Sequence, residues 1–277
     1  MLWTEDVLRS PSGLGYRRMG GGQPVVLLHG IPGSGATWAP VVEALPAGFD
    51  VIVPDLLGFG GSERPRSLDD LHAVAQASAV ASLLDELHLT GAVVVGHDFG
   101  GPVAVMLTAA RADLVGAIGL FATNTFPDTP IPFPLSTVNW PVVGAAAQRV
   151  LFCGLSLRML LRQAVGPGGP HLDPAVHLGD SAQQAAIATI FAGSLTGLAR
   201  LYEPVEAQLR SLDIPALVGW GDRDPLFSVE QGRRTADAAG VDLRLYSGAG
   251  HFLPQERPAD VAADIVILAS AASADIT

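Results

Sequence analysis

The stretch 93–101 holds the residue with the strongest chemical signal in the chain, Asp98. Three valines after Ala92 predict a buried strand, and the small apolar residues of 102–110 predict a helix that follows at once. Asp98 stands between them in Gly-His-Asp-Phe-Gly-Gly, with glycines two positions before and two after it. This is the pattern of a nucleophile elbow, a sharp strand-to-helix turn that projects its central side chain above the sheet. A plain turn whose aspartate caps the helix fits the same residues, so the partners of Asp98 must decide.

Two further polar clusters follow predicted strands near the end of the chain. Asp222 and Asp224 come after the strand 215–220, and His251 lies in the glycine-rich loop after the strand 242–246. Carboxyl ends of parallel strands meet at one edge of a sheet, so two carboxylates and an imidazole can gather beside the first turn. The alternatives are an Asx-type turn for the two aspartates and an ordinary surface position for the histidine.

Alternating apolar strands and helices must position these residues. The predicted strands are 3–8, 14–19, 25–28, 50–53, 92–95, 115–122, 215–220 and 242–246. The predicted helices outside the middle of the chain are 68–89, 102–110, 228–239 and one that opens at 257–258. Repeated strand–helix units predict an α/β fold with a mostly parallel central sheet and helices on both faces.

The segment 124–213 breaks this alternation. It begins rich in proline and continues as four helical pieces, 142–153, 155–164, 181–192 and 195–209. A run of helices between two sheet strands predicts a lid over the strand ends. We therefore expect a core domain of 1–123 and 214–277 with an inserted helical cap of 124–213.

Five motifs resemble the α/β-hydrolase superfamily, and within it the branch with an aspartate nucleophile: epoxide hydrolases and haloalkane or haloacetate dehalogenases. They are His29-Gly30-Ile31-Pro32, the stretch 55–62, the elbow 96–101, Gly221-Asp222-Arg223-Asp224-Pro225 and the stretch 248–252. They occur in the family's order of nucleophile, acid and histidine, and the match covers nearly the whole chain. The resemblance implies the α/β-hydrolase fold, with the cap inserted where the family keeps it.

The resemblance assigns a role to each polar residue. Asp98 is the nucleophile, and its carboxylate needs no activating base because it is ionised at neutral pH. It can displace at a saturated carbon and form an alkyl ester. His251 is the general base for the water that hydrolyses this ester. Asp224 orients His251, because the family usually places this acid before proline; Asp222 is its competitor.

Hydrogen-bond donors must hold two separate charges. The backbone N–H groups of Ile31 and Phe99 are the expected oxyanion hole for ester hydrolysis. The first displacement places charge on the leaving atom, which requires donors from the cap. Epoxide hydrolases usually present two cap tyrosines, but this cap has only Tyr202. We expect Tyr202 to be the proton donor and the indole N–H of Trp140 the second donor, with simple packing as the alternative for both.

Phe99 distinguishes the subclasses. Haloalkane dehalogenases usually carry Trp after the nucleophile and haloacetate dehalogenases carry Arg, whereas Phe99 offers neither group. Asn139-Trp140 and Tyr202 partly match the cap of haloacetate dehalogenases, so dehalogenation remains an alternative to epoxide opening. A non-catalytic small-molecule receptor and a cyclisation on the same site are alternatives of other classes. The expected substrate is a small apolar epoxide, with aromatic and polycyclic ones included, in a pocket lined by aromatic side chains: Trp38, Phe126, Phe133 and Phe152.

Composition limits the remaining possibilities. The 277 residues are 49% apolar, enough for a large core, and carry a net charge of −11 with no lysine. This balance argues against nucleic acid or an anionic membrane as partner. The N-terminus has no signal-peptide pattern and no apolar run reaches about 18 residues, so we expect a cytoplasmic protein, monomeric or homodimeric.

No metal or other cofactor is expected. The seven histidines are scattered, and the glycine-rich loop at 30–35 has no lysine for phosphate. Cys153 is the only cysteine, and we expect it to be an inert, buried thiol.

Overall fold

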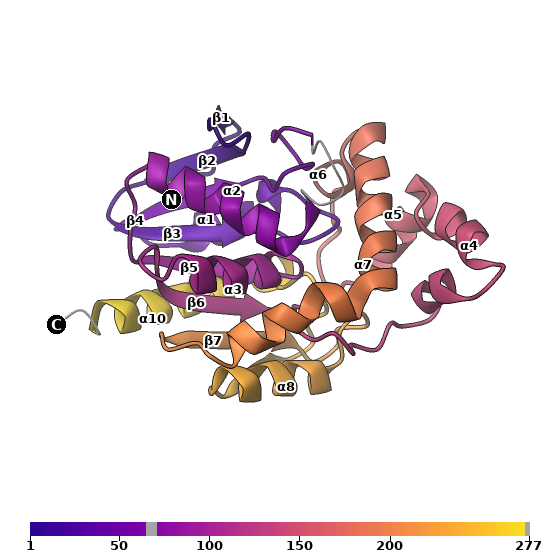
Figure 1. The fold of residues 1–277 in the computed structure, drawn as a ribbon. Coiled ribbons are helices and arrows are strands. Elements are labelled where there is room, and N and C mark those ends of the chain that lie inside the picture. The colour runs from indigo at the N-terminus through magenta and orange to yellow at the C-terminus, as the bar shows by residue number, and fades with distance from the viewer. Residues whose placement is uncertain (65–70, 275–277) are drawn as a thin grey trace.

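A computed structural model describes residues 1–64 and 71–274, and an eight-stranded sheet lies at the centre of this part of the chain (Figure 1). The strand order is β1-β2-β4-β3-β5-β6-β7-β8, and β2 pairs antiparallel with both of its neighbours while the remaining pairs are parallel. The strands are β1 (Leu8–Arg9), β2 (Gly15–Gly20), β3 (Gln23–Leu28), β4 (Phe49–Pro54), β5 (Ala92–His97), β6 (Val115–Phe121), β7 (Ala216–Gly221) and β8 (Leu243–Tyr246).

Helices cover both faces of the sheet, as predicted. Along β3, Val26 and Leu28 join one apolar core, whereas Val25 and Leu27 join the other, because successive side chains of a strand point to opposite faces. The first core includes residues of α2 (Ala73–Glu86), α3 (Gly100–Ala110) and α8 (Val229–Ala239). The second includes residues of α1 (Ala39–Ala44), α9 (Leu253–Glu256) and α10 (Pro258–Ala274). A short helix, η1 (Gly35–Trp38), precedes α1.

The chain between β6 and β7 forms a second group of helices beyond the carboxyl ends of the strands (Figure 1). They are η3 (Leu135–Asn139), α4 (Gly144–Leu151), α5 (Gly154–Gln163), α6 (Pro174–Leu178) and α7 (Ser181–Leu209). The last two predicted helical pieces, 181–192 and 195–209, lie in α7, whose two helical parts meet at a kink where the backbone of Gly197 is not helical. The division into core and cap domains remains a prediction, and we refer to 124–213 as the inserted segment.

Two sequence predictions differ from the structure at the start of elements. The predicted strand 3–8 is wrong: only Leu8 and Arg9 pair, opposite Tyr16 and Gly15, so the preceding residues lie beyond the edge of the ladder. The first residues of the predicted helix 68–89 lie outside the described part of the chain, and α2 begins at Ala73. Among the described residues no single helix is long and apolar enough to cross a membrane, although the bent pair α4 and α5 satisfies the length and composition criteria together.

Candidate active site

Asp98 lies in the turn between β5 and α3, and its backbone has a φ of +51°. This left-handed conformation is uncommon outside glycine, and aspartate tolerates it better than most residues. The flanking glycines let strand and helix approach: a Cβ on Gly96 would collide with the carbonyl of Gly100, and a Cβ on Gly100 would collide with that of Leu28. The Asp98 side chain is only 14% exposed.

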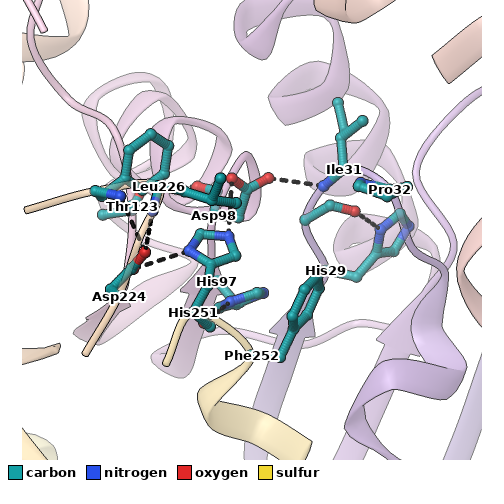
Figure 2. Close-up of polar contacts among 12 residues, drawn as sticks. His29, Ile31, Pro32, His97, Asp98, Thr123, Asp224, Leu226, His251 and Phe252 are labelled. Carbon is teal, nitrogen blue, oxygen red and sulfur yellow. Dashed lines mark hydrogen bonds and ion pairs between the residues drawn. The ribbon is translucent and has the colours of Figure 1, made fainter. Parts of the chain in front are cut away.

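The two oxygens of Asp98 have different partners (Figure 2). The Ile31 backbone N–H donates to Oδ1 at 2.7 Å, and the Nε2 atom of His251 lies 3.5 Å from Oδ2. Within the described chain, no acceptor is assigned to the amide of Phe99, the residue just before helix α3. One carboxylate oxygen is therefore held by an N–H group, and the other faces the imidazole.

His251 lies between Asp98 and Asp224 (Figure 2). Its Nδ1–H donates to Oδ2 of Asp224 at 2.9 Å. The other oxygen of Asp224 accepts the amides of Leu226 and Phe227 at 2.8 and 2.9 Å, which fixes the carboxylate. Asp222 instead accepts the Gly248 amide at 2.7 Å and so holds a turn.

The charge on His251 depends strongly on the carboxylates of Asp98 and Asp224 beside it. Burial of the His251 ring favours its neutral form, but the carboxylates of Asp224 and Asp98 outweigh burial and raise its pKa to about 10. Burial would likewise raise the pKa of Asp98, yet the hydrogen bond and charge of His251 lower it overall. At neutral pH the resting site therefore contains an imidazolium between two carboxylates.

Two side chains that the sequence analysis did not select, buried His97 and half-buried Glu256, hold the histidine loop. His97 Nε2 donates to the His251 carbonyl at 2.8 Å, and burial, together with the nearby His251 charge, lowers the His97 pKa to about 3. Glu256 accepts the amides of Gly250 and Phe252 at 2.8 and 2.9 Å. The position of His97 beside Asp98 was a usable signal, whereas nothing in the sequence distinguished Glu256.

The inserted segment also contributes to the turn that follows β3. The ring of His177, on α6, is buried and meets the Pro32 carbonyl through Nδ1 at 2.9 Å and the Gln255 amide through Nε2 at 3.0 Å. This bridge ties α6 both to the turn that carries the Ile31 amide and to α9.

A cavity of about 90 Å³ opens in front of Asp98. Its polar side chains are those of Asp98, Asn124, Thr129 and Tyr202, so the structure brings Tyr202 and Asp98 to the same space. Asn124 is buried, and its Oδ1 accepts the Phe126 amide and the Thr129 hydroxyl. The remaining lining is apolar: Ile31, Phe99, Pro130, Ile131, Pro132, Leu135, Leu160, Leu195, Leu226 and Phe227.

The aromatic residues expected around the substrate lie elsewhere, which corrects that expectation. Trp38, Phe126 and Phe152 are buried in the apolar cores, where their large surfaces contribute more than they would in a small cavity. Phe133 is 78% and Trp140 54% exposed, and neither lines the cavity. Trp140 therefore does not accompany Tyr202 as a donor in this structure.

Cys153 is exposed rather than buried, contrary to expectation. It precedes α5, where a contact with the Ser156 hydroxyl lowers the pKa of its thiol. Among the described residues no group of three or more His, Cys, Asp and Glu side chains could hold a metal ion.

Comparison with known proteins agrees with this geometry. Residues 23–141 match the family model described as alpha/beta hydrolase fold. The soluble epoxide hydrolase of a Corynebacterium species is 29% identical over 88% of this chain and 88% of its own length. Epoxide hydrolase A of Mycobacterium tuberculosis is 28% identical over 88% of this chain and 90% of its own length. Haloalkane dehalogenase 2 of the same species is 28% identical over 91% of this chain and 89% of its own length.

Solved structures show the same fold. An α/β hydrolase fold protein from Burkholderia ambifaria superimposes with a TM-score of 0.75, covers 96% of this chain and 98% of its own, and is 24% identical. The chain therefore has the α/β-hydrolase fold, and it is similar to epoxide hydrolases and haloalkane dehalogenases.

Proposed function

We propose that the protein is an epoxide hydrolase that opens small apolar epoxides to vicinal diols through an ester of Asp98. The observation that carries this proposal is the division of the Asp98 carboxylate: Oδ1 accepts the Ile31 amide, and Oδ2 faces His251. An apolar cavity that also contains the Tyr202 side chain lies in front of it. A carboxylate in this setting is suited to attack on a saturated carbon.

In the first step an Asp98 oxygen attacks one epoxide carbon. A carbon–oxygen bond forms as the ring carbon–oxygen bond breaks, and the Tyr202 hydroxyl gives its proton to the oxygen that is released. The product is a hydroxyalkyl ester of Asp98. Asn124 also faces this cavity with a side-chain amide, and it takes the place of Trp140 as the candidate second donor.

In the second step water hydrolyses the ester. His251 removes a proton from the water, whose oxygen attacks the ester carbonyl carbon, and the amides of Ile31 and Phe99 stabilise the oxyanion. Collapse of the tetrahedral intermediate breaks the bond between the carbonyl carbon and the alkyl oxygen. The diol leaves with a proton from His251. The proton that the imidazolium released after ester formation restores the Tyr202 hydroxyl, and the Asp98 carboxylic acid returns its proton to His251 and is again a carboxylate.

Esterification would also change the basicity of His251. Asp98 raises the pKa of His251 in the free enzyme, and an ester carries no charge. The pKa therefore falls once the intermediate forms, and the imidazolium can release its proton and act as a base. Asp98 thus keeps His251 protonated in the free enzyme, and its esterification gives the neutral imidazole that can accept a proton from water in the second step.

Dehalogenation is the second candidate, because a haloalkane dehalogenase is among the relatives and would use the same nucleophile. A departing halide needs N–H donors rather than a proton. The side chain of Phe99 has no N–H, and the indole of Trp140 lies outside the cavity. The hydroxyl of Tyr202 can protonate an alkoxide, and this favours an epoxide.

The decisive experiment traps the ester. A His251→Gln variant incubated with styrene oxide or epoxyhexane should gain the mass of one epoxide on the peptide that contains Asp98. In the unmodified protein, a single turnover in ¹⁸O-labelled water should place the label in the Asp98 carboxylate, with unlabelled diol. Asp98→Asn should give no adduct, and Asp222→Asn should react and hydrolyse normally.

Other outcomes would contradict the proposal in distinct ways. Epoxide that is bound and recovered unchanged would identify a receptor. Diol that carries the label after the first turnover would mean direct attack by water. Faster halide release from chlorohexane than epoxide opening would assign the site to dehalogenation.

The role of Tyr202 has its own test. Tyr202→Phe should slow ester formation about 100-fold, the usual contribution of a general acid, and leave ester hydrolysis unchanged. Rapid-quench measurement of both steps separates these rates. Tyr16→Phe, a buried tyrosine of β2 that does not line the cavity, is the matched control; unchanged ester formation in Tyr202→Phe would remove the role.

A further inference from the structure

Charge is unevenly distributed along the chain. The stretch 133–172 contains three arginines, Arg149, Arg158 and Arg162, and all 27 acidic residues of the chain lie outside it. No ion pair involves these three arginines in the described structure. This strongly acidic protein therefore has a positively charged segment at 133–172, which the total charge of −11 conceals.

The same stretch exposes apolar side chains. Seven of the thirteen large apolar side chains that are exposed in the described chain lie between residues 133 and 159. Leu155 and Met159 of α5 are 72% and 52% exposed, and Val142, just before α4, is fully exposed. An apolar concentration of this kind marks an interaction surface rather than the usual scatter of single residues.

Helical spacing places apolar and arginine side chains on one face of each of the two helices α4 and α5. On α5 the exposed residues Leu155, Arg158, Met159 and Arg162 are three and four positions apart, while Leu157 and Leu161 are buried. On α4 the exposed residues Ala146, Arg149 and Val150 have the same spacing. We call these seven exposed residues the outer face; both helices lie at the edge of the molecule (Figure 1).

A hollow of about 360 Å³ adjoins this face. Arg158, Arg162 and His171 line it together with the backbone of the glycine-rich loop 166–170. Two arginines that line one hollow can bind the phosphate of a lipid headgroup through their guanidinium groups.

We propose that the outer face docks on a membrane surface rich in anionic phospholipid, with its apolar side chains in the interface and its arginines among the headgroups. Arginines beside exposed apolar residues on amphipathic helices are the pattern of helices that lie in this plane. With 8 and 10 residues and a bend of 73°, α4 and α5 lie on the surface rather than cross it.

Charge favours a lipid surface over a second copy of the chain. A twofold dimer through the outer face would place Arg149, Arg158 and Arg162 against the same three arginines, without an acidic residue between them. Anionic headgroups supply the missing charge, and the acyl region takes the apolar side chains.

Docking would also bring the cavity in front of Asp98 close to the apolar interior of the membrane. Leu160 lines the cavity in front of Asp98 from α5, the helix that also carries the exposed side chains of Leu155 and Met159. An apolar molecule dissolved in the membrane would then meet the site across one helix. Membrane binding itself does not depend on the proposed reaction and is measured without turnover.

Sedimentation with lipid vesicles tests the proposal. The full chain should bind phosphatidylglycerol vesicles, bind them more weakly as salt rises, and bind phosphatidylcholine vesicles weakly. Arg158→Gln with Arg162→Gln should weaken binding to phosphatidylglycerol about 30-fold, at about 1 kcal/mol for each arginine. Leu155→Gln with Met159→Gln should weaken binding to both lipids about tenfold or more.

Matched controls carry the same substitutions on other surfaces. Ile267→Gln, 52% exposed on α10, and Arg9→Gln, exposed on β1, should bind vesicles like the unmodified chain. Absence of binding by the unmodified chain, or equal loss in the controls, would overturn the proposal. Dimers in light scattering that Leu155→Gln with Met159→Gln abolishes would assign the outer face to a second copy.

Discussion

The charge on Asp98 raises the pKa of His251, so a reaction that removes this charge lowers the pKa of the imidazole. Burial disfavours the imidazolium, and two carboxylates restore it. Removing either carboxylate must therefore lower the pKa of His251 toward or below its ordinary value of 6.5.

NMR titration of His251 checks this coupling. The pKa should lie near 10 in the unmodified protein and should fall in Asp98→Asn and in Asp224→Asn, whereas Asp222→Asn should leave it in place. A raised folded-state pKa gives stability that is complete below the unfolded value and lost as pH rises through the folded value. The free energy of unfolding should therefore decline between pH 6.5 and about 10, and less steeply in Asp98→Asn. An unchanged pKa in Asp98→Asn would contradict the coupling.

Single residues also show where sequence reasoning reaches its limit. Asp98, Asp224 and His251 were chosen from motifs after strand ends, and the structure brings those three together. Trp140 and the expected aromatic lining were chosen by residue type alone. An aromatic ring suits a core, a cavity or an exposed surface, and only the three-dimensional packing decides which it occupies.

The turn that carries Asp98 depends on the close approach of β5, α3 and β3. A methyl group on Gly100 would meet the backbone carbonyl of Leu28, which cannot move without displacing its strand. Gly100→Ala should lower the free energy of unfolding by about 3 kcal/mol or more in urea titration. Gly21→Ala, with no atom within 4 Å of the new methyl, should change it by at most about 1 kcal/mol. Equal effects would show that the approach is looser than the structure indicates.

The elements that the sequence predicted best are those with a buried partner on both sides. The valine-rich strands β3 and β5 and the helices beside them have an apolar pattern that no other element type fits. The inserted segment was harder to predict. Helix α6 has only five residues, too few for a period, and the break that the sequence predicted before 195 lies slightly later, at the kink of Gly197 between the two parts of α7. Of the strand predicted at 3–8, only Leu8 has a pairing partner on a neighbouring strand, and local sequence does not show which residues will find such a partner.

For the molecule as a whole, the small cavity limits what the site can hold. Its volume of about 90 Å³ is below the roughly 150 Å³ of a cavity that takes benzene, so ring-bearing epoxides need room from the surrounding helices. Leu160→Ala should enlarge the cavity from α5 and raise kcat/KM for styrene oxide relative to epoxypropane about tenfold. Leu157→Ala, buried on α5 but not lining the cavity, is the control. Equal ratios in the two variants would mean that α5 does not set substrate size.

The single exposed cysteine at the junction of α4 and α5 has a practical consequence. Because residues 1–277 contain no second thiol and no lysine, a maleimide dye will react only at Cys153 and an amine-reactive dye only at the N-terminal amine. The native protein can thus carry a fluorescent donor on the sheet side and an acceptor on the inserted helices without any substitution. Energy transfer between the two dyes would follow, one molecule at a time, how far those helices swing during turnover.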